Sequence, residues 1–165
     1  MQILPLLPSH WPDVKRIFEE GIATGLASLE TSAPTWEFWD KHHDPRCRIV
    51  AVEREEVMGW AALTPVSHRC VYGGVSEVSI YIGEAHRGRG IGKKLFQALI
   101  DTSEEAGFWT LESIVFQDNV PSIKLHEAVG FRQVGYREKI AEFKGKWINT
   151  VLLERRSKAV GVVNR

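Results

Sequence analysis

Residues 84–95, EAHRGRGIGKKL, combine the residue types of an anion-binding loop. Glycine lets a backbone approach a ligand closely, and the free N–H groups at the start of a following helix favour a negative charge. Cations in the same stretch add attraction for a pyrophosphate. The alternative is a glycine-rich turn that carries solvated charges. The residues that we expect to hold a pyrophosphate are Arg87, Gly88, Arg89, Gly90, Ile91, Gly92 and Lys93.

The two best-known phosphate-binding glycine loops do not match this segment. The P-loop, G-x-x-x-x-G-K-[ST], aligned on Gly92 and Lys93, would need glycine at Arg87 and serine or threonine at Lys94. The dinucleotide fingerprint G-x-G-x-x-G, begun at Gly88, would need a glycine in place of Lys93. What remains is R-x-x-G-x-G at the junction of a strand and a helix.

The apolar pattern around the loop predicts the elements that position it. Residues 75–82, VSEVSIYI, are rich in β-branched and aromatic residues and lead into the loop, and residues 91–106 carry an apolar stripe that ends at Gly107. Two earlier helices are expected, capped by Ser9 and Thr35, and Trp36 and Trp39 of the second are expected to line the core or a groove. The remaining expected elements are strands at 47–53, 57–65, 109–116, 131–138 and 148–155 and a helix at 119–130. Together they predict an α/β fold with a mixed sheet flanked by helices.

The composition predicts one globular domain, residues 1–165, whose last few residues form a loose tail. No apolar run approaches the roughly 20 residues that cross a bilayer, and no basic leader precedes the first helix, so we expect no membrane partner. Twenty-one basic residues balance 21 acidic ones, which argues against a nucleic-acid partner.

The cysteine and histidine content predicts a cytoplasmic protein without a metal. Cys47 and Cys70 are too few for a disulfide scaffold, so a reducing cytosol is the expected compartment. His42 and His43 lie side by side in the sequence without a spaced third ligand, so we expect solvated surface there rather than a zinc site.

Four segments in the same order resemble the GNAT superfamily of acetyl-CoA-dependent N-acetyltransferases. EVSIYI, RGRGIG, NVPSIKLHEAVGF and KGKW are similar to its phosphinothricin and methionine sulfoximine acetyltransferase branch. The resemblance covers nearly the whole chain and implies a mostly antiparallel, twisted sheet with a splay between two central strands. It also implies that the loop holds the pyrophosphate of coenzyme A. The implied contacts with the pantetheine arm are Ser79, Ile80, Tyr81, Ile82, Asn119 and Ser122.

Transfer of an acetyl group to an amine requires a base. An aliphatic amine with a pKa near 10 is only about one part in a thousand neutral at pH 7, and only the neutral form attacks a thioester. Strand alternation puts Glu77 on the same face as Ser79 and Tyr81, just before the loop. The resemblance implies that Glu77 is the general base, and a solvent-facing strand glutamate is the alternative.

Later steps need a stabilised oxyanion and a departing thiolate. A backbone N–H of Ser79 or Ile80, freed where two strands splay apart, is the expected oxyanion donor. The resemblance suggests His126 as a general acid, although a histidine that packs its helix is an equal alternative. Asn119 and Ser122 have an alternative or additional role as helix caps.

The resemblance implies a small amino-acid-like acceptor such as phosphinothricin or methionine sulfoximine. Arg69 offers a fork for a carboxylate or phosphinate and Tyr72 an aromatic wall, whereas a ligand-free loop cation is the alternative for Arg69. Asn149 stands where related sequences often carry an acid, which puts any contact there in doubt. A non-catalytic acyl-CoA-binding sensor is the alternative function. Many relatives are homodimers, so a homodimer is expected from the resemblance alone.

Overall fold

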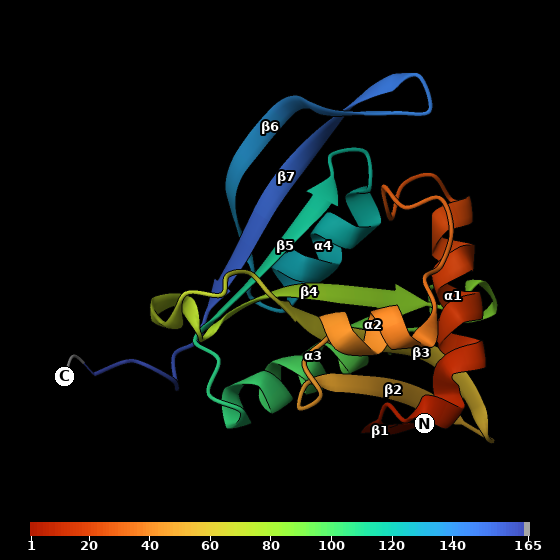
Figure 1. Ribbon diagram of the computed structural model, residues 1–165, viewed down its shortest axis with the longest axis horizontal. Coiled ribbons are helices and arrows are strands. Elements are labelled where there is room, and N and C mark those ends of the chain that lie inside the picture. Colours follow the sequence, from red (N-terminus) through yellow and green to blue (C-terminus); the bar gives the residue numbers. More distant parts are fainter. Residues whose placement is uncertain (164–165) are drawn as a thin grey trace.

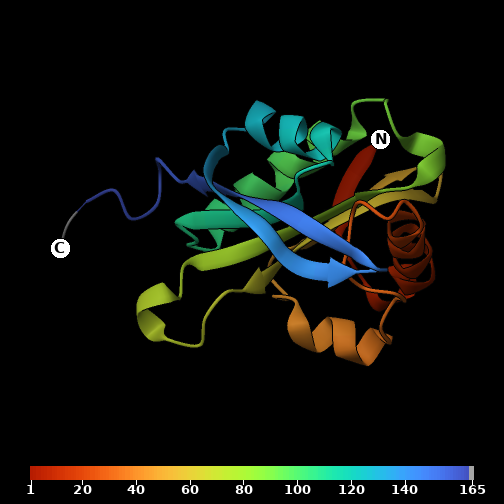
Figure 2. The same ribbon diagram turned by 90° about the horizontal axis from the view of Figure 1, so that it is seen from above.

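The computed structural model describes residues 1–163, which form one seven-stranded sheet with helices on both faces (Figures 1 and 2). The strand order is β1-β2-β3-β4-β5-β7-β6; β4 and β5 pair in parallel and the other neighbours antiparallel. The strands are β1 (Gln2–Pro5), β2 (Arg48–Glu53), β3 (Glu56–Pro65), β4 (Val75–Ile82), β5 (Thr110–Phe116), β6 (Arg132–Phe143) and β7 (Lys146–Arg156). The predicted mixed, mostly antiparallel sheet is confirmed.

Helices cover the two faces of the sheet in pairs. They are α1 (Trp11–Ala23), α2 (Trp36–His42), α3 (Ile91–Glu105) and α4 (Val120–Ala128). Figure 2 shows α1 and α2 on one face and α3 and α4 on the other. Local signals set several ends: the Thr35 and Asn119 side chains accept backbone N–H bonds at the starts of α2 and α4, and Gly107 follows α3 with φ 90°. No helix of the described chain is long and apolar enough to cross a bilayer.

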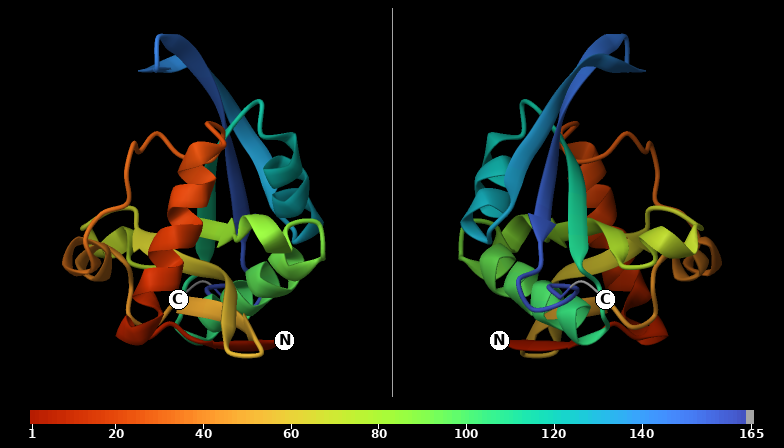
Figure 3. Two further views of the ribbon diagram at one scale, coloured as in Figure 1. Left: turned by 90° about the vertical axis from the view of Figure 1, so that its right-hand side faces the viewer. Right: turned by 90° about the vertical axis from the view of Figure 1, so that its left-hand side faces the viewer.

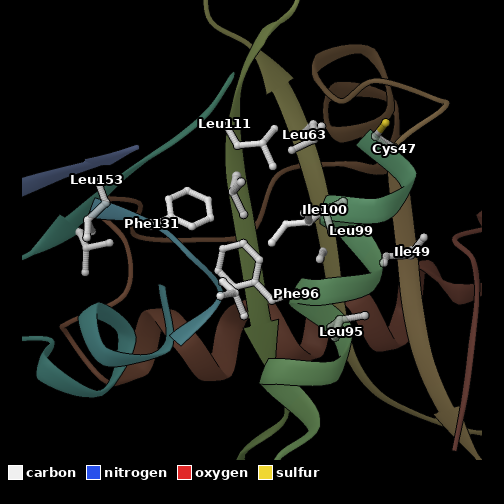
Figure 4. Close-up of a cluster of buried hydrophobic side chains, with 14 of the residues drawn as sticks. Cys47, Ile49, Leu63, Leu95, Phe96, Leu99, Ile100, Leu111, Phe131 and Leu153 are labelled. Atoms are coloured by element: carbon white, nitrogen blue, oxygen red, sulfur yellow. The ribbon is translucent and has the colours of Figure 1, made fainter. Parts of the chain in front are cut away.

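Two groups of buried side chains fix the sheet between these helices. Leu95, Phe96 and Leu99 of α3 pack against the central strands (Figure 4), whereas Trp39 of α2 packs with Trp60 on the opposite face. Strand alternation divides β4 between the two groups. Its residues 78, 80 and 82 face α3, and Tyr81 faces α1, which confirms the expected face for residues 77, 79 and 81.

The two central strands separate partway along their length. β4 pairs with β5 only from Val75 to Glu77, opposite Thr110 to Glu112. Beyond Glu77, β4 continues to Ile82 with β3 on its other side. Figure 1 shows β4 and β5 diverging from this shared start. The expected splay is therefore present, and it leaves an open strand edge immediately before the glycine loop.

The N-terminal segment differs from the prediction in two places. Residues Gln2–Pro5 form β1, an edge strand that pairs with β2 and that the sequence pattern was too short to reveal. The first helix is not capped by Ser9, because Ser9 lies in a 3-10 turn and His10 occupies the N-cap position. Pro12 sets this later start, since proline favours the first turn of a helix.

The C-terminal hairpin is longer than predicted and projects from the body of the protein (Figure 3). A bulge between Arg137 and Ala141, with Lys139 at φ 47°, interrupts the alternation that would mark β6 as one strand. After β7, the Arg156 guanidinium donates to the carbonyls of Val160 and Gly161 at 2.8 and 2.7 Å. This part of the expected loose tail is therefore anchored, and residues 164 and 165 lie outside the described residues.

Candidate active site

A cavity of about 770 Å³ lies where β4 and β5 separate. Its walls come from both strands, from the start of α4, and from the segment that connects α1 to α2. The volume falls within the range of about 300–1,000 Å³ that is usual for small-molecule sites. The cavity therefore places a partly open, ligand-sized space beside the free edge of β4.

Glu77 lines this cavity at the last residue pair that joins β4 to β5. Burial raises the pKa of its carboxyl, and the neighbouring Glu112 carboxylate raises it further. A carboxylate with a raised pKa holds a proton more tightly and is a stronger base than an exposed one. The position and the environment of Glu77 therefore suit the acceptance of a proton from an amine.

The loop after β4 leaves room for an anion against its backbone. Gly88 and Gly90 have φ values of 76° and 79°, and a Cβ on either would meet nothing within 4 Å. Gly90 is the N-cap of α3, and no side chain caps this end. The open backbone and the free helix start fit the pyrophosphate of coenzyme A. Gly92 acts differently, because its added Cβ would lie 3.3 Å from Leu125, so it lets α3 pack against α4.

Arg89 of the loop is held in a network of the protein's own side chains. Its guanidinium donates to His86 Nδ1 at 3.0 Å and pairs with Glu53 at 3.5 Å. Because His86 Nδ1 accepts this bond, Nε2 carries the proton and donates to Glu56 at 2.9 Å. The network joins the loop to the turn between β2 and β3. Arg89 therefore faces that turn in this structure, which departs from the expected pyrophosphate contact.

The free edge of β4 and the first residues after it make up the rest of the predicted coenzyme site. Ser79, Ile80 and Tyr81 line the cavity. Arg87 Nε donates to the Ile82 carbonyl at 3.3 Å, so this arginine stays close to the end of the strand. Ile91 is buried beneath the first turn of α3 and anchors it, and Lys93 is exposed on the same turn.

Three predicted residues border the cavity: Asn119 just before α4, and Ser122 and His126 within it. Asn119 caps the helix and its Nδ2 donates to the Leu26 carbonyl at 3.3 Å, which confirms the capping role. His126 is buried, with Nδ1 2.6 Å from the Ser122 carbonyl and Nε2 2.9 Å from the Ser113 hydroxyl. Since a carbonyl only accepts, Nδ1 is the donor. Burial also lowers the pKa of His126, so Nε2 accepts from Ser113.

Arg69 and Tyr72 lie outside this cavity, in the exposed turn between β3 and β4. The Arg69 guanidinium stacks over the Tyr72 ring at 5.8 Å. Neither residue borders the cavity, so the structure gives no support to the expected anchoring of an acceptor by Arg69 and Tyr72. Asn149 has a structural role, because its Oδ1 accepts from the Lys139 N–H at 2.8 Å and its Nδ2 donates to Gln117 at 3.1 Å.

We call the part of the cavity that is lined by α1, α2, β3, β4 and the segment between the two helices the acceptor side. It has an aromatic wall that the sequence pattern did not reveal. Tyr81 stacks on Trp60 with ring centroids 5.0 Å apart and meets the edge of Phe18 at 5.0 Å. The pattern around Trp39 predicted only core or groove lining. His43, expected on solvated surface, is half-buried and stacks on Trp39 at 4.1 Å, where burial lowers its pKa to about 4. All five residues border the cavity.

Comparisons with known proteins agree on one family. The model of the acetyltransferase (GNAT) family matches residues 11–131. YwnH of Bacillus subtilis (strain 168), named provisionally as a phosphinothricin acetyltransferase, is 33% identical over 147 residues that cover 86% of this chain and 90% of YwnH. The phosphinothricin N-acetyltransferase of Alcaligenes faecalis is 30% identical over 155 residues, or 87% of this chain and 76% of that protein.

A solved structure shows the same fold. A GNAT superfamily phosphinothricin acetyltransferase from Sinorhizobium meliloti, in complex with acetyl-CoA, matches with a TM-score of 0.87 at 23% identity. The match covers 99% of this chain and 91% of that one. The extent of the family match and the identity to YwnH together decide the assignment: the chain belongs to the GNAT family of acetyltransferases.

Proposed function

We propose that this acetyltransferase takes an acetyl group from acetyl-CoA and passes it to the primary amine of a small molecule, with Glu77 as the general base. The observation that carries the proposal is the position of Glu77, which lines the cavity where the open edge of β4 begins. A non-catalytic protein of this fold that only binds acyl-CoA has no need of a carboxylate with a raised pKa at this position. Catalysis is therefore favoured over a sensor function.

Different residues of the chain carry out different steps of the proposed reaction. Acetyl-CoA supplies an acyl thioester, and the free edge of β4 and the glycine loop orient it. Glu77 takes a proton from the ammonium of the acceptor, which frees the nitrogen lone pair for attack on the thioester carbonyl. A backbone N–H of Ser79 or Ile80 donates to the oxyanion that forms.

His126 plays a supporting part in this proposal. Its Nδ1 proton is committed to the Ser122 carbonyl and its neutral Nε2 accepts from Ser113, so it has no proton directed at a departing thiolate. We therefore assign it the alternative role of packing α4 against β5. When the C–S bond breaks, the thiolate of coenzyme A, whose thiol pKa is near 8.5, leaves without obligatory protonation. The attacking nitrogen gives its second proton to water, which leaves a neutral amide.

The names of the relatives make amino-acid analogues the first acceptors to assay. Phosphinothricin and methionine sulfoximine or sulfone are the acceptors printed in the names of the Alcaligenes faecalis and Salmonella typhimurium proteins. We propose acceptors of this type for this chain. A cytoplasmic location and a homodimer stay predictions that rest on the two cysteines and on the resemblance.

Release of coenzyme A across a panel of amines, read with a thiol reagent, tests the proposed function. Acetyl-CoA-dependent release that requires an amine, with the acetylated amine identified by mass spectrometry, is the expected result. A thermal upshift with acetyl-CoA but no turnover on any amine would favour the sensor instead. No upshift and no turnover would remove the coenzyme assignment.

A further inference from the structure

Glu20, near the end of α1, contacts the beginning of the glycine loop. Its Oε2 accepts the Glu84 N–H at 2.7 Å, across 64 residues of sequence. Glu84 opens the 3-10 turn Glu84–His86, which leads from β4 into the loop. A carboxylate that accepts a backbone N–H makes a charge-assisted hydrogen bond, which is stronger than a bond between neutral groups. Glu20 therefore links α1 to the start of the expected pyrophosphate site.

Both carboxylate oxygens of Glu20 have partners. Oε1 accepts from the Arg16 guanidinium at 2.8 Å, one helical turn earlier, and the Glu20 side chain is 23% exposed. Burial opposes the ionised form, but the hydrogen bonds from Glu84 and Arg16 and the charges of Arg16 and Arg87 outweigh it and lower the pKa of Glu20. The carboxylate is therefore ionised at neutral pH and is held in one orientation toward the loop.

The packing of α1 brings Glu20 within reach of the loop. A Cβ added at Gly21 would lie 2.6 Å from Tyr81 Cδ1, so glycine at this position lets α1 lie closely against the end of β4 (Figure 1). On the other side, the Gly83 N–H donates to the Met58 carbonyl of β3 at 2.8 Å. The point where Glu20 meets the loop is thus fixed by a helix and by a strand.

The middle of the loop depends on glycine, so its ends must be fixed by other residues. Gly88 and Gly90 have positive φ values, and a Cβ on either would meet nothing within 4 Å. Glycine loses more conformational freedom than any other residue when it becomes ordered. Buried Ile91 anchors the loop at the start of α3, and Glu20 anchors it at the other end. A loop with fixed ends loses less freedom when a ligand binds.

Arg87 is the loop cation that Glu20 influences. Its Nε donates to the Ile82 carbonyl at 3.3 Å, and its charge acts on the Glu20 carboxylate. Both interactions draw the guanidinium toward the end of β4. Arg87 is also exposed, so it is accessible to an anion that approaches the loop.

We propose that Glu20 is a positioning residue for acetyl-CoA, because it fixes the start of the glycine loop and keeps Arg87 at the end of β4 before the coenzyme binds. The proposal deepens the proposed function and rests on its use of acetyl-CoA. Glu20 acts through the Glu84 N–H and through Arg87, and it exchanges no proton in the reaction.

The charge of Glu20 separates this role from a direct electrostatic effect. A carboxylate near a pyrophosphate repels it, so removal of the carboxylate alone would strengthen coenzyme binding. Loss of the fixed loop start would weaken coenzyme binding instead. The two effects have opposite signs, so the direction of the change in the KM for acetyl-CoA shows which one dominates.

Steady-state kinetics with Glu20→Ala and Glu20→Gln test the proposal. Glu20→Ala should raise the KM for acetyl-CoA roughly tenfold, as expected for the loss of one charged hydrogen bond. Its kcat and its KM for the amine should change less than about twofold, because Glu20 does not border the cavity. Glu20→Gln keeps an oxygen for the Glu84 N–H and should restore most of the wild-type KM. An unchanged or lower KM for acetyl-CoA in Glu20→Ala would overturn the proposal.

Glu19→Ala is the matched control, because Glu19 is the neighbouring residue of α1, is exposed and pairs with Lys15 at 4.0 Å. It should leave the KM for acetyl-CoA within about twofold of the wild type. A rise in Glu19→Ala as large as that in Glu20→Ala would assign the effect to α1 as a whole and overturn the specific role of Glu20.

Amide hydrogen exchange in the unliganded protein tests the same bond without the coenzyme. The Glu84 N–H should exchange roughly tenfold faster in Glu20→Ala than in the wild type, and at the wild-type rate in Glu19→Ala. Equal exchange in Glu20→Ala and the wild type would refute the proposal. Failure of the wild type to bind acetyl-CoA would refute the proposed function instead, and the exchange rates would still decide whether Glu20 fixes the loop.

Discussion

The coenzyme side and the acceptor side of the candidate active site offer a ligand different kinds of chemical group. The coenzyme side consists of one continuous stretch, β4 and the glycine loop that opens α3, and it offers mainly backbone groups and left-handed glycines. The acceptor side gathers side chains from α1, α2, β3, β4 and the segment between the helices. A ligand held by backbone is sensitive to glycine replacement and tolerant of side-chain changes. A ligand held by side chains shows the reverse sensitivity.

The largest expected effect falls on the boundary between the two sides, at Glu77. Glu77→Gln should lower kcat by a factor on the order of one hundred or more, because it removes the proton acceptor, and should leave acetyl-CoA binding intact. The deficit should shrink at high pH, where the amine loses its proton unaided. Steady-state kinetics across pH is the measurement, and an equal deficit at every pH would assign Glu77 a structural role.

Glu112→Gln is the control for this prediction. Glu112 pairs with Glu77 across the two strands and its charge raises the pKa of Glu77, but it does not line the cavity. Ionised Glu77 is the active form, so activity rises with pH through its raised pKa. Removal of the neighbouring charge lowers that pKa, and the acidic limb of the rate profile should move to lower pH with an unchanged plateau.

The second prediction tests the coenzyme side, where we expect backbone groups to hold the ligand. Acetyl-CoA at one hundred times its dissociation constant should stabilise the wild type by about 2.7 kcal/mol, measured as a thermal upshift. Gly90→Val should abolish the upshift, because φ 79° is strained for a β-branched residue and the side chain would fill the approach to the backbone. Gly135→Ala is the control, since an added Cβ there meets nothing within 4 Å. A full upshift in Gly90→Val would refute a backbone site.

The same contrast explains how far each side could be predicted from sequence. β4 was placed to the residue, and the start of α3 was clear, because strand propensity, alternation and glycines are local signals. The acceptor wall depends on tertiary packing that brings Phe18, Trp60 and Tyr81 together from three separate elements. The spacing of these three residues in the sequence does not indicate that their side chains are in contact. The expected role of Arg69 relied on its nearness to Glu77 in sequence. That nearness does not fix the direction of a turn, and here the turn keeps Arg69 outside the cavity.

The third prediction concerns the stability of the aromatic wall. The pKa of His43 is about 4 in the folded protein, against an ordinary value of 6.5 that holds when the chain unfolds, so only the unfolded chain binds the extra proton between these values. The contribution to stability is fully present above pH 6.5 and is lost as pH falls toward 4. Because His43 is partly exposed, we expect a loss of about 1–2 kcal/mol. Denaturant unfolding at several pH values measures it.

His43→Gln should flatten this part of the stability profile, since the amide does not titrate. His42→Gln is the neighbouring control, because His42 is exposed and stacks on Phe38 instead. An unchanged slope in His43→Gln would show that the imidazole is not held neutral by the wall. A flattened slope in both variants would assign the effect to the segment rather than to His43.

The smallest expected effect comes from replacing Arg89. It tests whether this side chain only holds the glycine loop in place or contacts the pyrophosphate directly. Arg89 faces Glu53 and His86, so Arg89→Ala should raise the KM for acetyl-CoA only about threefold, through a less fixed loop, with kcat unchanged. Glu53→Gln should produce a similar rise if bracing is the cause. A direct contact predicts the opposite for Glu53→Gln, because removing a carboxylate near a pyrophosphate would strengthen binding. A rise on the order of a hundredfold in Arg89→Ala, with tighter binding in Glu53→Gln, would show that Arg89 turns to the pyrophosphate when acetyl-CoA is bound.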